Sequence, residues 1–152
     1  MNTKEYINNK LIDLRIACHP VRMMADIDIH MQLPQPLITP LSMLPKKLST
    51  KLSEKEIYDF GLGISNNSFQ FKKTYCFIPK PLVFAYAIAL AVSGNAKQIY
   101  LAGFDGFESD EKRNIGLEGI IQLFLKANTC LKITAITPTT YKGIESKSVY
   151  GI

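Results

Sequence analysis

The chain has 152 residues, of which 47% are hydrophobic and 20% are charged, and its formal net charge is +5. This length suits a single domain, residues 1–152, with its own hydrophobic core. The mildly basic surface favours anionic partners only weakly. Just three arginines are present and no basic motif is interleaved with aromatics, so nucleic-acid binding is not expected.

The sequence predicts a soluble, cytoplasmic protein without a membrane span. Its first ten residues are polar, unlike a secretory signal, and its longest apolar run, residues 82–92, is about half as long as a bilayer-spanning helix. The three cysteines, Cys18, Cys76 and Cys130, form no C-x-x-C pair, so we expect buried, reduced thiols. Neither histidine stands at ligand spacing from a cysteine, and no metal site is predicted.

The first half of the chain alternates short apolar and polar stretches after a short polar helix at 3–10. Apolar residues at every second position predict a strand over 12–18, and a proline then opens a weakly patterned helix over 21–31. A strand over 37–39, one or two helical turns over 42–48 and a strand over 57–62 follow. Four lysines between residues 46 and 55 indicate either a solvated face or a landing site for a partner.

The second half carries the strongest patterns. Residues 69–78 form one long strand or an extended segment, and 82–93 read as a helix that is apolar nearly all round. Gly94 is the expected left-handed residue after that helix. A continuous apolar strand over 98–102 then leads into a loop, Gly103 to Gly106.

A further helix is predicted from Ser109, which suits the N-cap position. Its buried stripe consists of Leu117, Ile120, Ile121 and Phe124. Two glycines inside this helix, at 116 and 119, indicate close packing against a neighbour, because each costs about 1 kcal/mol relative to alanine. The last strand covers 131–136 and is followed by a polar loop and a short tail.

This alternation of strands and helices predicts an α/β fold. Successive strands joined by helices are mostly parallel, with right-handed crossovers. We therefore expect one three-layer, Rossmann-like domain built on a mostly parallel sheet.

The loops after the strands are the expected place for a ligand, since the carboxyl ends of parallel strands meet at one edge of the sheet. Together they offer an imidazole, a guanidinium, hydroxyls and one carboxylate, which suits a phosphate, carboxylate or sugar. The candidate ligand-binding residues are His19, Arg22, Ser42, Gly103, Asp105, Gly106, Thr137 and Thr139.

Each candidate also has a purely structural explanation. His19 could cap a helix, Asp105 could simply form the turn between its two glycines, and the threonines could satisfy loop backbone groups. Arg22 opposes the dipole of a helix start, which favours an anionic partner. No G-x-G-x-x-G, Walker or G-x-S-x-G motif occurs, so no cofactor is predicted and catalytic residues stay unassigned.

Three blocks of the sequence resemble a known group of proteins. They are IPKPLVFAYAIALAVSGNAKQIYLAGFDGF, DEKRNIGLEGIIQLFL and AITPTTYKGIESKSVYGI, supported upstream by IDLRIACHPVR and PLITPLSMLP. Over residues 12–152 the chain resembles the C-terminal α/β domain of bacterial aldolase-like proteins. These come from gene clusters for surface polysaccharides and nonulosonic (sialic-type) sugars. In them an aldolase-type barrel precedes the α/β domain, and that barrel has no counterpart in this sequence.

A more distant similarity links the helix–turn–strand block, residues 85–105, to bacterial sialyltransferases that use CMP-sialic acid and to pterin diphosphokinase-like domains. Those families begin with a strand and a G-x-G-P-S loop that holds the nucleotide, and this sequence contains neither. The sheet is therefore expected to lack its first strand, either because the chain is a piece of a larger protein or because it is a stand-alone relic. The sialyltransferases also use a downstream histidine, and no histidine follows His30.

These similarities imply three functional hypotheses. The first is an accessory or ligand-binding domain of a sugar pathway that takes a sugar nucleotide or an acidic sugar and is not catalytic alone. The second is a sugar-nucleotide-dependent transferase with Arg22, Asp105 and Thr139 around the substrate. The third is a structural module that docks an aldolase barrel or forms a homo-oligomer.

Overall fold

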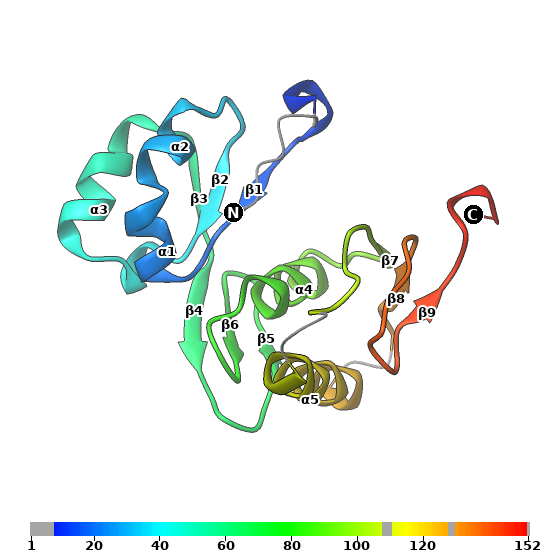
Figure 1. Cartoon of the computed structure of the whole chain (residues 1–152). Helices are drawn as coiled ribbons and strands as arrows, with labels where there is room; N and C mark the ends of the chain where they lie inside the picture. Colours follow the sequence, from blue (N-terminus) through cyan, green and yellow to red (C-terminus); the bar gives the residue numbers. More distant parts are fainter. Residues whose placement is uncertain (1–7, 108–110, 128–129, 152) are drawn as a thin grey trace.

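A computed structural model describes residues 8–107, 111–127 and 130–151. These residues form a mixed α/β structure with three small sheets of three strands each, mostly parallel (Figure 1). Short 3-10 helices occur at Asn9–Leu11, Leu41–Met43, Leu52–Glu54 and Val149–Gly151. The polar helix predicted over 3–10 lies largely outside the described residues, which show only the first of these 3-10 turns.

The first sheet contains β1 (Arg15–Ile16), β2 (Leu37–Thr39) and β3 (Ile57–Asp59), paired in parallel in that order. The strand predicted over 12–18 is therefore much shorter than expected. β2 is buried along its whole length, because its neighbours occupy both edges and a cluster of apolar side chains covers it.

Three short helices lie together beside this sheet: α1 (Pro20–Ala25), α2 (Ile27–Gln32) and α3 (Lys46–Lys51) (Figure 1). The single helix predicted over 21–31 is wrong, because the chain breaks at Asp26, which has a ψ of 12°. Met23 of α1 and Ile27 of α2 both belong to this apolar cluster.

The second sheet contains β4 (Gly61–Ile64), β6 (Tyr75–Ile78) and β5 (Gln70–Phe71), in that order. β4 and β6 are parallel, whereas β5 and β6 are antiparallel, so residues 69–78 form a hairpin and not one long strand. The strand predicted over 57–62 is divided between two sheets, with Phe60 between β3 and β4.

Helix α4 (Val83–Ser93) packs on β5 and β6 and buries Ala85, Tyr86, Ile88 and Ala89. The Tyr86 hydroxyl donates a hydrogen bond to the carbonyl of Phe60, which ties the helix to the β3–β4 junction. The left-handed residue after α4 is Asn95, with a φ of 57°, and not Gly94 as predicted. The Ala96 N–H bonds the Ala91 carbonyl, as in a Schellman motif, and asparagine tolerates the left-handed position it requires.

The third sheet contains β7 (Gln98–Leu101), β8 (Lys132–Ala135) and β9 (Glu145–Ser146), all parallel. Helix α5 (Glu111–Ala127) connects β7 to β8, and Figure 1 shows α4 and α5 between this sheet and the β4–β6 sheet. The main core lies there, and it includes the predicted stripe of α5 together with Phe69. The predicted N-cap, Ser109, lies outside the described residues.

The glycines of α5 do not mark a close contact. A β-carbon added at Gly116 or Gly119 would meet no described atom within 4 Å. The prediction of close packing at these two positions is therefore wrong, because both face open space.

Candidate functional site

The loops after β7 and β8 leave the third sheet side by side. Leu101 and Ala135 are register partners at the ends of these parallel strands. The Ile136 N–H donates to the Leu101 carbonyl at 2.8 Å and extends the pairing by one residue. The two loops therefore start at the same edge, as expected for the carboxyl ends of parallel strands.

Thr137 connects the two loops. Its hydroxyl accepts a hydrogen bond from the Gly103 N–H at 2.9 Å and donates one to the Asp105 carboxylate at 3.2 Å. Gly103 adopts a φ of 67°, which turns the chain after β7. One hydroxyl thus fixes both the start of the β7 loop and the orientation of its carboxylate.

Thr140 holds the other side of the same loop. Its backbone N–H and its hydroxyl both donate to the Asp105 carbonyl, at 3.2 Å and 3.1 Å. Gly106, which follows, has a φ of 112°, and a β-carbon there would lie 2.4 Å from the Thr140 hydroxyl oxygen. A glycine is required at this position both by its backbone conformation and by the closeness of Thr140.

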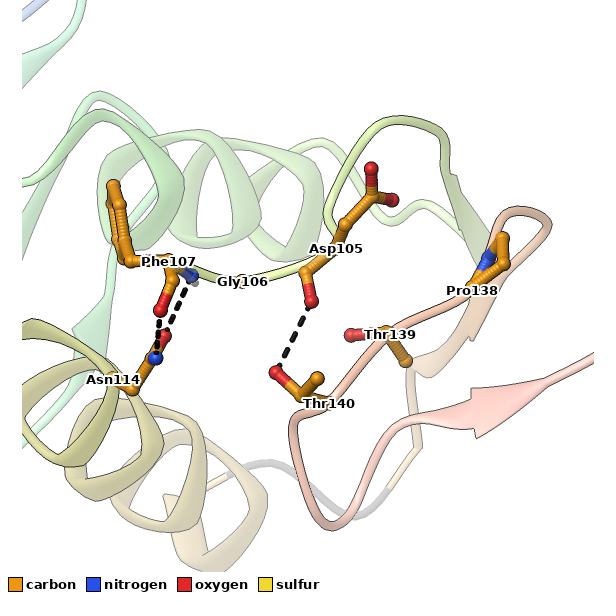
Figure 2. A pocket seen from close by; sticks show the side chains of 7 residues that line it. All are labelled: Asp105, Gly106, Phe107, Asn114, Pro138, Thr139 and Thr140. Atoms are coloured by element: carbon orange, nitrogen blue, oxygen red, sulfur yellow. Dashed lines mark hydrogen bonds between the residues drawn. The ribbon is translucent and has the colours of Figure 1, made fainter. Parts of the chain in front are cut away.

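Asn114, on α5, pairs with the backbone of Phe107 much as a neighbouring strand would. Its Oδ1 accepts from the Phe107 N–H at 2.9 Å, and its Nδ2 donates to the Phe107 carbonyl at 2.6 Å (Figure 2). The Tyr141 hydroxyl donates to the same Oδ1 at 2.9 Å. Asn114 therefore joins the helix, the β7 loop and the β8 loop.

Aromatic side chains pack the β7 loop against α4 and the β8 loop. Phe104 stacks on Phe84 of α4 with ring centroids 4.4 Å apart, and it contacts Tyr141 at 4.9 Å. Burial raises the pKa of Tyr141, so its hydroxyl stays protonated and remains a donor to Asn114 at neutral pH. The loops are thus anchored to the core and to α4.

Between the loops and α5 lies an open cavity of about 580 Å³. It is lined by Asp105, Gly106, Phe107, Asn114, Pro138, Thr139 and Thr140. In Figure 2 the Asp105 carbonyl points toward Thr140, while its carboxylate points the other way, to the rim. The Arg113 guanidinium lies over the Phe107 ring, 5.6 Å from its centre, so a positive charge stands close to this cavity.

The structure divides the eight predicted site residues between different places. Five of them lie together in or beside the cavity just described: Gly103, Asp105, Gly106, Thr137 and Thr139. His19 and Arg22 line a separate cavity of about 290 Å³ between the end of β1 and the start of α4. Ser42 is exposed in a 3-10 turn and lines neither cavity. The separation arises because β1 and β2 belong to a different sheet from β7 and β8.

Several residues of the site were missed by sequence reasoning: Phe107, Asn114, Thr140 and Tyr141. An asparagine early in a helix carries no distinctive pattern, and its partner is a backbone segment seven residues away. The sequence offers one signal for Phe107, which directly follows the loop from Gly103 to Gly106; in the structure this residue is 44% exposed.

The cysteines differ from their predicted burial in one case. Cys18 and Cys76 are buried, and burial raises the pKa of each thiol to about 12, whereas Cys130 is exposed.

Within the described part of the chain, no three histidine, cysteine or acidic side chains are grouped so that they could hold a metal ion. In the same residues, no helix is both long and apolar enough to cross a membrane.

These features define a mixed α/β protein with a loop-built cavity at the carboxyl ends of two parallel strands. Comparison of the chain with family models, with curated proteins and with solved structures finds no match.

Proposed function

We propose that this chain is an accessory, ligand-binding domain of a bacterial surface-polysaccharide or sialic-type sugar pathway. Its ligand is an acidic sugar or a sugar nucleotide, bound in the cavity between the β7 and β8 loops. The observation that carries the proposal is the combination of a carboxylate, hydroxyl groups and an exposed aromatic ring around one open cavity of about 580 Å³. The resemblance of residues 12–152 to the domain of aldolase-like proteins supplies the pathway.

The chemistry of the lining suits the hydroxyl-bearing part of such a ligand. Asp105 can accept hydrogen bonds from sugar hydroxyls, and the Thr139 hydroxyl can donate or accept. The exposed face of Phe107 offers an apolar surface for the C–H groups of a sugar ring. Among the described residues that line the cavity, Asp105 is the only charged one. An acidic group would therefore lie away from it, toward Arg113.

A Rossmann-like arrangement of the three sheets is part of this proposal. One extended segment, β3 to β4, already belongs to two of them. Among the described residues β7 pairs with β8 on one edge only. The Leu101 carbonyl faces β8, so the backbone groups of Tyr100, the residue before it, point to the other edge. The upstream strand implied by the resemblance would pair at that edge.

The two alternatives have less support. A transferase that uses Arg22 together with Asp105 and Thr139 requires these residues in one site, but they line different cavities. A module that docks an aldolase barrel or a second copy would use the edge of β7 that pairs with no described strand. That edge is compatible with docking, but no described contact favours a particular partner.

The proposal is tested by calorimetric titration of the chain with sialic acid, CMP and CMP-sialic acid. We expect saturable binding of at least one sugar-containing ligand, weakened by Asp105→Asn and by Thr139→Val. Both changes keep the size of the side chain: the first removes the negative charge and one acceptor oxygen, and the second removes the hydroxyl. The absence of binding by all three ligands would contradict the proposal.

Ser42→Ala is the matched control, because it also removes one hydroxyl but lies outside the cavity. It should leave binding unchanged. If it weakens binding as much as Thr139→Val does, the ligand is not held between the β7 and β8 loops.

A further inference from the structure

Thr137 lies at the start of the β8 loop and contacts the β7 loop without lining the cavity of the proposed sugar site. The residues around that cavity include Asp105 and Thr139 but not Thr137, which is only partly exposed. Strand pairing fixes its position, because the preceding residue, Ile136, bonds the Leu101 carbonyl and extends the parallel pairing of β7 and β8. A contribution of Thr137 to ligand binding therefore has to act through a neighbouring residue.

The Thr137 hydroxyl already uses its proton within the protein. Its oxygen accepts a hydrogen bond from the Gly103 N–H at 2.9 Å, and its O–H donates to the Asp105 carboxylate at 3.2 Å. A hydroxyl has one proton to donate, so none is left for a ligand. The bond from Gly103 fixes the accepting side of the oxygen and thereby directs the O–H toward Asp105.

The β8 loop holds Asp105 at two points. Thr137 holds its carboxylate, and Thr140 donates to its carbonyl from both the backbone N–H and the hydroxyl. Gly103 and Gly106, which have φ values of 67° and 112°, lie on either side of Asp105 in a segment with high intrinsic freedom. The direction of the carboxylate therefore depends on the hydrogen bonds from the β8 loop.

The Asp105 carboxylate has no structural task within its own loop. An aspartate that stabilises a turn accepts from a nearby backbone N–H, but among the described residues the only donor to this carboxylate is the Thr137 hydroxyl. No described lysine or arginine forms an ion pair with it. One carboxylate oxygen is thus free to accept, and Figure 2 shows the carboxylate at the rim of the cavity. An ionised carboxylate only accepts hydrogen bonds, so a ligand that binds this oxygen must supply the donor.

We propose that Thr137 is the positioning residue of the sugar site. It does not contact the ligand but orients the Asp105 carboxylate, so that the free oxygen accepts a hydrogen bond from a ligand hydroxyl. This inference rests on the proposed function and adds which ligand group Asp105 recognises. The physical reason is preorganisation, because a carboxylate that is already oriented loses less side-chain entropy when the ligand binds. A ketone or an ionised phosphate has no proton to donate and gains no hydrogen bond at this position.

The experiment is a double-mutant cycle on the full chain, with the binding of sialic acid and CMP-sialic acid measured by calorimetry. Thr137→Val keeps the shape of the side chain and should weaken binding by at least about tenfold, because the charged acceptor loses its orientation. Thr137→Ser keeps the hydroxyl and should restore the affinity. Thr50→Val is the matched control, because it removes an exposed hydroxyl from α3, far from the cavity lining, and should leave binding unchanged.

The Asp105→Asn background separates positioning from general support of the loop. There Thr137 would hold the amide oxygen and leave the amide nitrogen, a donor, at the position of the ligand hydroxyl. Adding Thr137→Val to Asp105→Asn should therefore change the affinity by less than about twofold.

A second measurement needs no ligand. The Gly103 N–H donates to the Thr137 hydroxyl, so its hydrogen exchange, followed by nitrogen-15 NMR, should be faster in Thr137→Val than in Thr137→Ser or the unchanged chain.

Three results would overturn the inference. The first is equal binding by Thr137→Val and the unchanged chain. The second is additive losses from Thr137→Val and Asp105→Asn, which would mean that Thr137 supports the loop without acting through the carboxylate. The third is unchanged exchange at Gly103 in Thr137→Val. If the unchanged chain binds neither ligand, the proposed function itself fails and this inference fails with it, whereas the three results above leave the proposed function standing.

Discussion

Asn114 provides the most direct test of how the candidate sugar site is held together. Its side chain pairs with both the N–H and the carbonyl of Phe107 and accepts from the Tyr141 hydroxyl. Replacing it with alanine removes all three hydrogen bonds at once. No other described element bonds the Phe107 backbone, so the backbone of the β7 loop would lose its hydrogen bonds to α5.

The expected loss follows from these bonds. Each contributes about 0.5–1.5 kcal/mol, with the two to Phe107 at the lower end because they are exposed. The Tyr141 hydroxyl, only partly buried, can turn to water and recover part of its loss. Alanine is the better helix former by up to about 0.7 kcal/mol, which offsets some of the total. We expect Asn114→Ala to lower the free energy of unfolding by about 1.5 kcal/mol.

The measurement is urea unfolding followed by circular dichroism. Asn114→Asp is the matched control, because its carboxylate still accepts from the Phe107 N–H and the Tyr141 hydroxyl. It loses the donor to the Phe107 carbonyl and sets an oxygen against that carbonyl, which the stronger bonds to a charged acceptor offset in part. It should cost no more than about 1 kcal/mol. A loss below about 0.5 kcal/mol for the alanine variant, or an equal loss for both variants, would refute the idea that Asn114 joins the three segments.

Three further predictions concern backbone conformation and thiol burial. Gly116→Ala should raise the free energy of unfolding by about 1 kcal/mol, since no described atom lies near its added methyl group; a destabilised variant would reveal a hidden contact. Gly106→Ala should lower it by about 1–3 kcal/mol, because of its φ of 112° and the adjacent Thr140 hydroxyl; unchanged stability in the same urea assay would contradict this. In mildly alkaline solution iodoacetamide should modify Cys130 much faster than Cys18 or Cys76, whose thiols are buried with pKa values of about 12; equal modification by peptide mapping would disagree.

Sequence patterns predicted those helices and strands whose buried face shows in their own residues. The apolar run at 82–93 corresponds to α4, and the spacing of Leu117, Ile120, Ile121 and Phe124 corresponds to the buried face of α5. The strand before the Gly103 loop is β7, within one residue of its predicted end. In each case the periodicity of side-chain burial follows from the geometry of a single helix or strand.

Sequence patterns did not predict which strands pair when the pairing partners are distant in sequence. The segment at 69–78 becomes a hairpin because β5 pairs back on β6, and the segment around Phe60 is shared between two sheets. Neither the hairpin nor the shared segment can be recognised from local periodicity, because both depend on which other strand pairs with the segment. The missed role of Asn114 has the same origin, because its partners are a backbone segment and a tyrosine 27 residues away.

The sequence by itself determined the mixed α/β class, the main helices and the polar loops that follow the strands. Only the tertiary structure decided how these loops group. It brings Thr137 and Thr139 to Asp105, because β7 and β8 are parallel neighbours, and it leaves His19 and Arg22 beside a second cavity, because β1 lies in another sheet. The physical reason is that a local pattern fixes which face of an element is buried, whereas the position of each loop depends on long-range strand pairing.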